Sequence, residues 1–171
     1  MNYNKEESHK IFEFCNVIFL NLARFQDYVI PGDRIFKENR GVRILLECNG
    51  KEYEETIFPQ ADKSLANNII LAVEKIARKS KITEEMFDDS SLRVFIFDFP
   101  SRILGDVEKN FEFGKEGLYV EYVSYKGFLF PSEEYKDKIE FLEAVCKEAA
   151  LTKDSWQNRR ALFYSFKVQE L

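Results

Sequence analysis

The strand-like segments of this sequence come in runs, and this order limits the fold more than any other feature. Helical apolar periodicity covers about residues 5–26, 63–80 and 133–150, and the strand patterns occupy the intervals and the end of the chain. The strand patterns lie at residues 42–48, 53–58, 92–99, 118–123, 128–130 and 162–168. Regular βαβ alternation, which a parallel sheet requires, is missing. The order therefore predicts an α+β fold with a mostly antiparallel sheet flanked by helices.

The clearest local signal is the pair Asn49-Gly50, which stands between two apolar runs. Both central residues of a type I′ turn need a positive φ angle, and Asn and Gly tolerate it best. We therefore expect a β-hairpin over residues 42–58.

The segment 92–99 is apolar on both faces except for Arg93 and Asp98. Such a pattern is typical of a central strand covered on both sides. An unpaired carboxylate is costly to bury there, so we expect Asp98 to face the sheet edge or to pair with a basic residue; a functional acid with a raised pKa is the alternative.

The composition describes one ordinary globular unit. At 171 residues the chain can bury roughly 70% of its unfolded surface, which is enough for a core without disulfides. No linker, repeat or low-complexity segment interrupts the chain, and a terminal strand ties its end into a sheet. We therefore expect a single compact domain over residues 1–171.

Residue types that many enzymes and metal sites need are scarce. His9 is the single histidine, the three cysteines lie far apart without a C-x-x-C pair, and no Gly-rich phosphate loop or G-x-S-x-G element occurs. We expect no catalytic residue, no metal and no cofactor, and we interpret the cysteines as buried free thiols of a reducing cytosol.

The net charge bears on possible nucleic-acid binding, and the length of the apolar runs bears on where the protein is located. Arg159-Arg160 near Trp156 could contact nucleic acid, but the net charge of −5 argues against a basic binding face. No signal-peptide apolar region is present, and the longest apolar run, residues 17–20, is too short to cross a membrane. We expect a cytoplasmic protein without membrane association. Abundant Lys and Glu with scarce Gln indicate an archaeal or thermophilic source.

A series of short motifs in the second half of the chain follows a recognisable order and spacing. They are I-T-E-E-M at residues 82–86, F-G-K-E-G-L-Y-V at 113–120, G-F-L-F-P at 127–131, F-L at 141–142, C-K-E-A-A-L at 146–151, D-S-W at 154–156 and L-F-Y-S-F at 162–166. Over about residues 80–171 they resemble the AMMECR family, named for an Alport-syndrome and elliptocytosis chromosomal region. Ala150 stands where that family usually has Gly. The resemblance implies an antiparallel sheet flanked by helices, with a small C-terminal subdomain.

The first half departs from the pattern of that family. Its signature L-R-G-C-I-G corresponds to V-R-I-L-L-E at residues 42–47, where Arg43 is retained and Leu45 replaces the cysteine. The resemblance implies that the plausible nucleophile is lost. We therefore expect a non-catalytic interaction or scaffold protein rather than an enzyme.

Two alternatives remain open. The first is a small-ligand-binding protein or enzyme whose site contains Arg43, Glu47 and Trp156, where the sheet meets the C-terminal subdomain. The second is an RNA-associated protein. We expect an unknown protein partner before a nucleic acid, and the resemblance implies Memo-type or radical-SAM proteins as partners.

Overall fold

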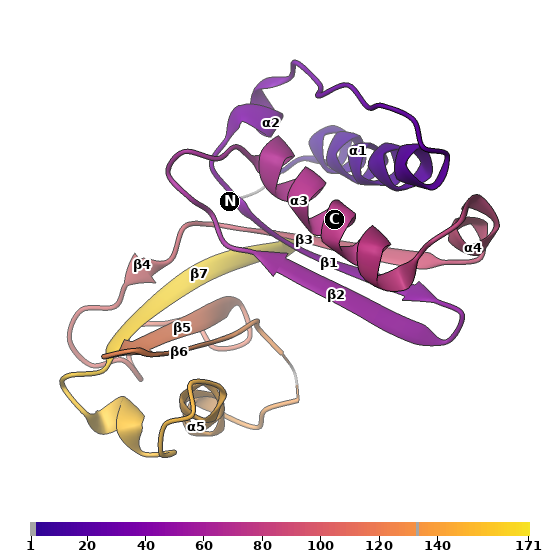
Figure 1. Cartoon of the computed structure of the whole chain (residues 1–171). Coiled ribbons are helices and arrows are strands. Elements are labelled where there is room, and N and C mark those ends of the chain that lie inside the picture. Colours follow the sequence, from indigo (N-terminus) through magenta and orange to yellow (C-terminus); the bar gives the residue numbers. More distant parts are fainter. Residues whose placement is uncertain (1–2, 133) are drawn as a thin grey trace. The chain divides into compact units, whose positions relative to one another are not determined.

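The computed structural model describes residues 3–132 and 134–171, which divide into two compact units (Figure 1). Unit 1 holds the described residues up to Phe99 together with Gln169–Leu171, and unit 2 holds Pro100–Val168. Each unit combines antiparallel strands with helices. The fold therefore belongs to the α+β class, as the order of the sequence patterns predicts. That the two units act as a single domain stays a prediction.

Unit 1 is an antiparallel sheet with two long helices on one face (Figure 1). In this sheet β1 lies between β2 and β3, α3 packs against β1 and β2, and α1 packs against α3. The elements are α1 (Lys5–Ala23), α2 (Arg34–Lys37), β1 (Gly41–Cys48), β2 (Lys51–Ile57), α3 (Leu65–Ser80), α4 (Glu84–Asp88) and β3 (Ser91–Phe97).

Alternation along β1 decides which face the helices cover. Val42, Ile44 and Leu46 are fully buried and belong to the same apolar cluster as the inward residues of α1 and α3. Because successive side chains of a strand point to opposite faces, Arg43 and Glu47 lie on the other face of the sheet.

The predicted hairpin is confirmed. Asn49 and Gly50 have φ angles of 52° and 68°, as a type I′ turn requires, and Cys48 pairs with Lys51 on either side of the turn. The register of β1 and β2 follows directly from this two-residue connection.

The prediction that β3 is covered on both faces is confirmed only at the end of the strand, where Phe97 is fully buried on the face that also carries Arg93. Val94 and Ile96 are buried against the helices, but Arg93 is exposed and Phe95 is only half-buried. The guanidinium of Arg93 lies 5.0 Å from the centre of the Phe95 ring. The side chain of Arg93 therefore covers part of the Phe95 face of β3, where the apolar pattern had predicted a second layer of protein.

Asp98 has the basic partner that we expect. Its Oδ1 lies 2.7 Å from a guanidinium nitrogen of Arg40 just before β1.

The backbone N–H of Tyr3 donates to the Gln169 side chain at 2.8 Å, and the Gln169 amide donates back to the Tyr3 carbonyl at 3.0 Å. These bonds fix the last residues of the chain to the start of unit 1.

Unit 2 is a second antiparallel sheet with one helix against it (Figure 1). Its strand order is β4-β7-β5-β6, and α5 packs on β5 and β6. The elements are β4 (Ser101–Arg102), β5 (Glu116–Tyr122), β6 (Tyr125–Leu129), α5 (Lys138–Glu148), the 3-10 helix η1 (Ser155–Gln157) and β7 (Leu162–Glu170). Residue 133, where the predicted helix begins, lies outside the described residues. The helix α5 begins at Lys138, and Asp137 caps it by accepting the N–H of Glu140.

Gly127 explains why β6 and the end of α5 can lie so close together. A Cβ atom at this position would meet the backbone nitrogen of Ala149 at 2.4 Å, which is well inside van der Waals contact. Glycine is therefore required in the family-like motif at residues 127–131 for packing, since the backbone of α5 fills the space of a side chain.

The C-terminal end of α5 is a Schellman motif. The N–H of Ala150 donates to the Lys147 carbonyl at 2.8 Å, and the N–H of Leu151 donates to the Cys146 carbonyl at 2.9 Å. Ala150 has a φ angle of 56°, which is left-handed and strained for a residue with a Cβ. This is the position where the resemblance expects glycine.

The substitution Ala150→Gly is expected to stabilise the protein. Glycine adopts the left-handed conformation without the strain of about 1 kcal/mol that an alanine has there. Removal of this strain should raise Tm by roughly 2–4 °C. Differential scanning calorimetry measures this shift. The control Ala149→Gly changes the preceding residue, whose φ is −80°, and should lower Tm. A lower Tm for Ala150→Gly would contradict the assignment of strain to this helix end.

Candidate functional site

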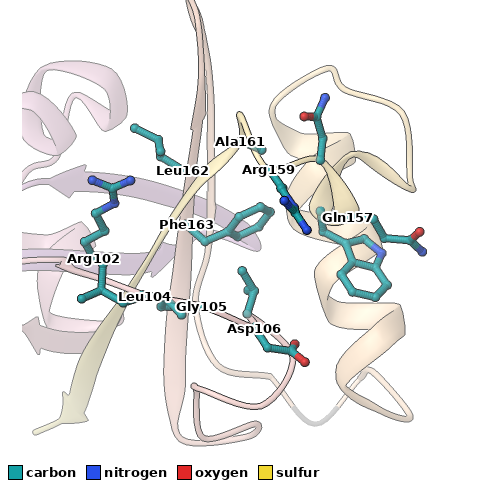
Figure 2. A pocket seen from close by; sticks show the side chains of 13 residues that line it. Arg102, Leu104, Gly105, Asp106, Gln157, Arg159, Ala161, Leu162 and Phe163 are labelled. Carbon is teal, nitrogen blue, oxygen red and sulfur yellow. The ribbon is translucent and has the colours of Figure 1, made fainter.

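A pocket of about 560 Å³ opens in unit 2 (Figure 2). Two segments form its walls, residues 102–107 after β4 and residues 156–163, which run from η1 into β7. Its volume falls within the range of pockets that hold small molecules, about 300–1,000 Å³. The pocket is therefore the candidate functional site of this unit.

The pocket has an apolar part and a polar part. Phe163 is 2% exposed and belongs to the core of unit 2, and Ala161 is buried beside it. Ile103, Val107 and Trp156 are half-buried and pack against the same core. A ligand in this pocket could therefore contact both apolar and polar side chains.

Hydrogen bonds hold the wall that carries Trp156. The carbonyl of Asn158 accepts the N–H of Ala161 at 2.9 Å, and its side-chain oxygen accepts the N–H of Arg160 at 3.0 Å. These bonds fix the backbone on both sides of Arg159. The backbone from which the exposed Arg159 side chain extends is therefore held in place.

The opposite wall is held in the same way. The N–H of Ile103 donates to the Phe163 carbonyl at 2.8 Å, and this bond joins the two segments of the pocket. The carboxylate of Asp106 forms an ion pair with Lys109 at 3.0 Å. The hydrogen bond from Lys109 holds the pKa of Asp106 below its ordinary value, so this carboxylate is charged at neutral pH.

Two cations, Arg102 and Arg159, line the pocket, and neither forms an ion pair with the described residues. In the view of Figure 2, Arg159 is drawn between Phe163 and Gln157, whereas the guanidinium of Arg102 points away from them. Five arginines of unit 1 do form ion pairs; they are Arg24, Arg40, Arg43, Arg78 and Arg93. The pocket therefore offers a positive charge that the described protein does not neutralise.

The nucleophilic and metal-binding groups of the described residues lie elsewhere. All three cysteines are free and buried. Burial raises the pKa of Cys146 to about 11 although a hydrogen bond from the backbone of Trp156 opposes this shift, and burial also raises the pKa of Cys15. Within residues 3–132 and 134–171, no group of three or more His, Cys, Asp and Glu residues is placed to hold a metal ion.

The structure places the site residues expected from the sequence in different units. Arg43 lies on β1 of unit 1, where two of its nitrogens contact the Glu54 carboxylate at 2.8 and 3.0 Å. Glu47 is exposed four residues further along the same face. Trp156 lies in the pocket of unit 2. The structure thus brings Arg43 and Glu47 onto one face, and a site that also includes Trp156 stays a prediction.

Sequence reasoning missed most of the pocket. Arg159 drew notice only as half of a basic pair, and the segment 102–107 showed nothing beyond the turn pattern Gly105-Asp106. The usable signal was the motif at residues 154–156, which carries Trp156 and stands directly before Arg159. The partner wall could not be found this way because it lies some fifty residues earlier in the chain.

Comparison with known proteins identifies the class to which this fold and pocket belong. The family model named AMMECR1 matches residues 48–171. The chain therefore belongs to the AMMECR1 family, as the resemblance of its second half indicates. The matched region begins directly after residues 42–47, where the family signature is rewritten.

Two of the similar proteins come from methanogenic archaea. The protein MJ0810 of Methanocaldococcus jannaschii is 31% identical over 96% of this chain and 89% of its own length. A protein of Methanocella arvoryzae is 27% identical over 96% of this chain and 77% of its own length. These sources agree with the Lys- and Glu-rich composition, and the names of the two relatives state no activity.

A solved structure confirms the fold. The crystal structure of the uncharacterized protein PH0010 from Pyrococcus horikoshii matches with a TM-score of 0.74 and 22% identity. The match covers 95% of this chain and 89% of that one.

In the described part of the chain, every helix is too short or too polar to span a membrane.

The buried thiols are expected to be unreactive in the folded protein. With a pKa of about 11, Cys146 at pH 8 would be thiolate in about one molecule in a thousand, and it is sterically covered as well. A thiol-specific chromogenic disulfide should therefore detect none of the three cysteines in native protein and all three in guanidinium chloride. One thiol that reacts within seconds in native buffer would show that a cysteine is accessible.

Proposed function

We propose that this protein is a non-catalytic binding protein and that it holds a small anionic molecule in the pocket of unit 2. One observation carries the proposal. Arg159, which has no ion-pair partner among the described residues, lines a pocket that also contains the half-buried ring of Trp156 and other apolar side chains. An arginine is charged at every physiological pH, so an anion can neutralise it there.

The surroundings of Arg159 offer an anion a second kind of contact. Arg159 is exposed, and the half-buried Trp156 lines the same pocket, so an anion bound there could contact both the charge and an aromatic ring. Guanidinium groups also bind carboxylates and phosphates through two parallel hydrogen bonds. A ligand with either group would gain both directionality and energy at this position.

Binding without catalysis fits the chemistry of the described residues. The thiols are buried and largely protonated, and Asp106 is an ionised, ion-paired carboxylate rather than a proton donor. Three free thiols also fit the reducing cytoplasm, which is part of the proposal. An RNA-associated role would need a wider basic surface than one arginine provides.

Thermal unfolding with a panel of small anions tests the proposal. A bound anion at a hundred times its Kd stabilises the fold by about 2.7 kcal/mol, which should raise Tm by roughly 5–10 °C in a chain of this size. The panel would contain phosphate, citrate, adenosine monophosphate and aromatic carboxylates, with neutral analogues beside them.

Two matched variants locate the effect. Arg159→Met keeps the aliphatic stem but removes the charge, and it should weaken the stabilising anion at least tenfold. Arg160→Met removes the neighbouring charge, which is not part of the pocket lining, and should leave the affinity unchanged. Equal losses in the two variants, or no stabilising anion, would contradict the proposal.

A second candidate function, docking of a protein partner, rests on the segment that follows α1. Phe25 is 99% exposed, Val29 86% and Ile30 49%. Phe25 also has a left-handed φ of 56° at the Schellman end of α1, a position that glycine fills best. An aromatic side chain that is strained and contacts little of its own fold is suited to contact another protein.

Purified candidate partners test this second function. The Memo-type and radical-SAM proteins that the family resemblance implies would be titrated against the wild type and the double variant Phe25→Gly with Val29→Ser. The variant should lose at least tenfold in affinity and should itself be more stable, because the strain at residue 25 is relieved. The control Val123→Ser alters another exposed valine, in unit 2, and should bind normally. Unchanged affinity in the double variant would remove this segment as the docking surface.

A further inference from the structure

We infer that the ligand of the unit 2 pocket is an aromatic ring with an anionic group at one end and an N–H donor at the other. This inference rests on the proposed function and names the class of ligand. Amino-substituted mononucleotides and amino-substituted aromatic carboxylates share this chemistry.

The two charged ends of the pocket support a ligand with two unlike ends. Arg159 lies on one wall and Asp106 on the other, and no ion pair within 4.0 Å joins them in the described structure. Opposite charges that face one pocket without contact leave room for a molecule that contacts both. Its anionic group would bind the guanidinium, and its donor would bind the carboxylate.

Asp106 is held in place and still has capacity to accept a hydrogen bond. It forms an ion pair with the side chain of Lys109 at 3.0 Å. A carboxylate has about four lone-pair sites, so some remain for a ligand. Asp106 would repel a second anionic group, which excludes ligands that are negatively charged at both ends.

The inner surface between these ends favours a flat ring. The half-buried Trp156 contributes most of the aromatic surface, with Phe163 almost fully buried behind the same wall, and Val107 and Ile103 contribute aliphatic surface from the other wall. Aromatic side chains bind flat rings by stacking or by edge-to-face contact. No described residue accepts a hydrogen bond from the indole N–H of Trp156, so this group can also bind a heteroatom of the ring.

The decisive comparison uses pairs of probes that differ only in the donor. Adenosine monophosphate carries a ring amino group where inosine monophosphate carries a carbonyl, and 4-aminobenzoate carries an amino group that benzoate lacks. Isothermal titration of the full chain should show tighter binding of the amino member, by about tenfold or more, in at least one pair. The pair that shows it distinguishes a nucleotide from an aromatic acid.

Variants assign the preference to its residues. Asp106→Leu should abolish the difference between the two members of the pair, whereas Glu134→Leu, which alters an exposed acidic residue outside the pocket lining, should preserve it. Trp156→Phe should retain most of the affinity and Trp156→Leu should lose it. The Phe variant keeps the test valid if the Leu variant fails to fold.

The outcomes separate this inference from the proposed function. If phosphate or citrate binds through Arg159 as tightly as the aromatic probes, the pocket binds anions and the inference about the ring is wrong. If the amino and oxo or unsubstituted probes bind equally, the role of Asp106 is wrong. If no probe binds and Arg159→Met changes nothing, the proposed function fails as well.

Discussion

The backbone pairing of β7 is the constraint on which the pocket of unit 2 depends. Ser101 and Arg102 of β4 pair with one side of this strand, and β5 pairs with the other. The bond from Ile103 to the Phe163 carbonyl extends the β4 side by one residue. Both walls of the pocket begin where the chain leaves these pairs. The pocket therefore exists because two segments about fifty residues apart share one strand as their anchor.

Close packing at the end of α5 helps to position the following segment, which contains Trp156. Gly127 admits the backbone of Ala149, and the left-handed Ala150 then turns the chain sharply away from the helix. The N–H of Leu151 completes that turn, and η1 follows within a few residues. The family-like motifs at the end of α5 thus have a structural role that ends in the placement of the pocket wall.

Local signals were sufficient wherever neighbouring residues determine the geometry. The turn at Asn49-Gly50 and the α+β order of the elements were both predictable for this reason. The face of β3 that carries Arg93 was predicted correctly only at the end of the strand, because an apolar pattern does not say whether a second layer or an arginine stem covers a face. For the candidate site, Trp156 was found from its motif. Asp106 was not, because its role depends on a wall far away in the sequence.

The sequence by itself determined the class of fold, the family and the absence of the family cysteine at residue 45, since these follow from patterns and from residue identity. The tertiary structure alone decided which charged side chains form ion pairs within the described protein and which do not. Arg43, the retained residue of the rewritten signature, is held by Glu54, whereas Arg159 forms no ion pair with the described residues and lines the pocket that contains Trp156. Charge pairing depends on distance in space, and strand pairing between remote segments sets that distance.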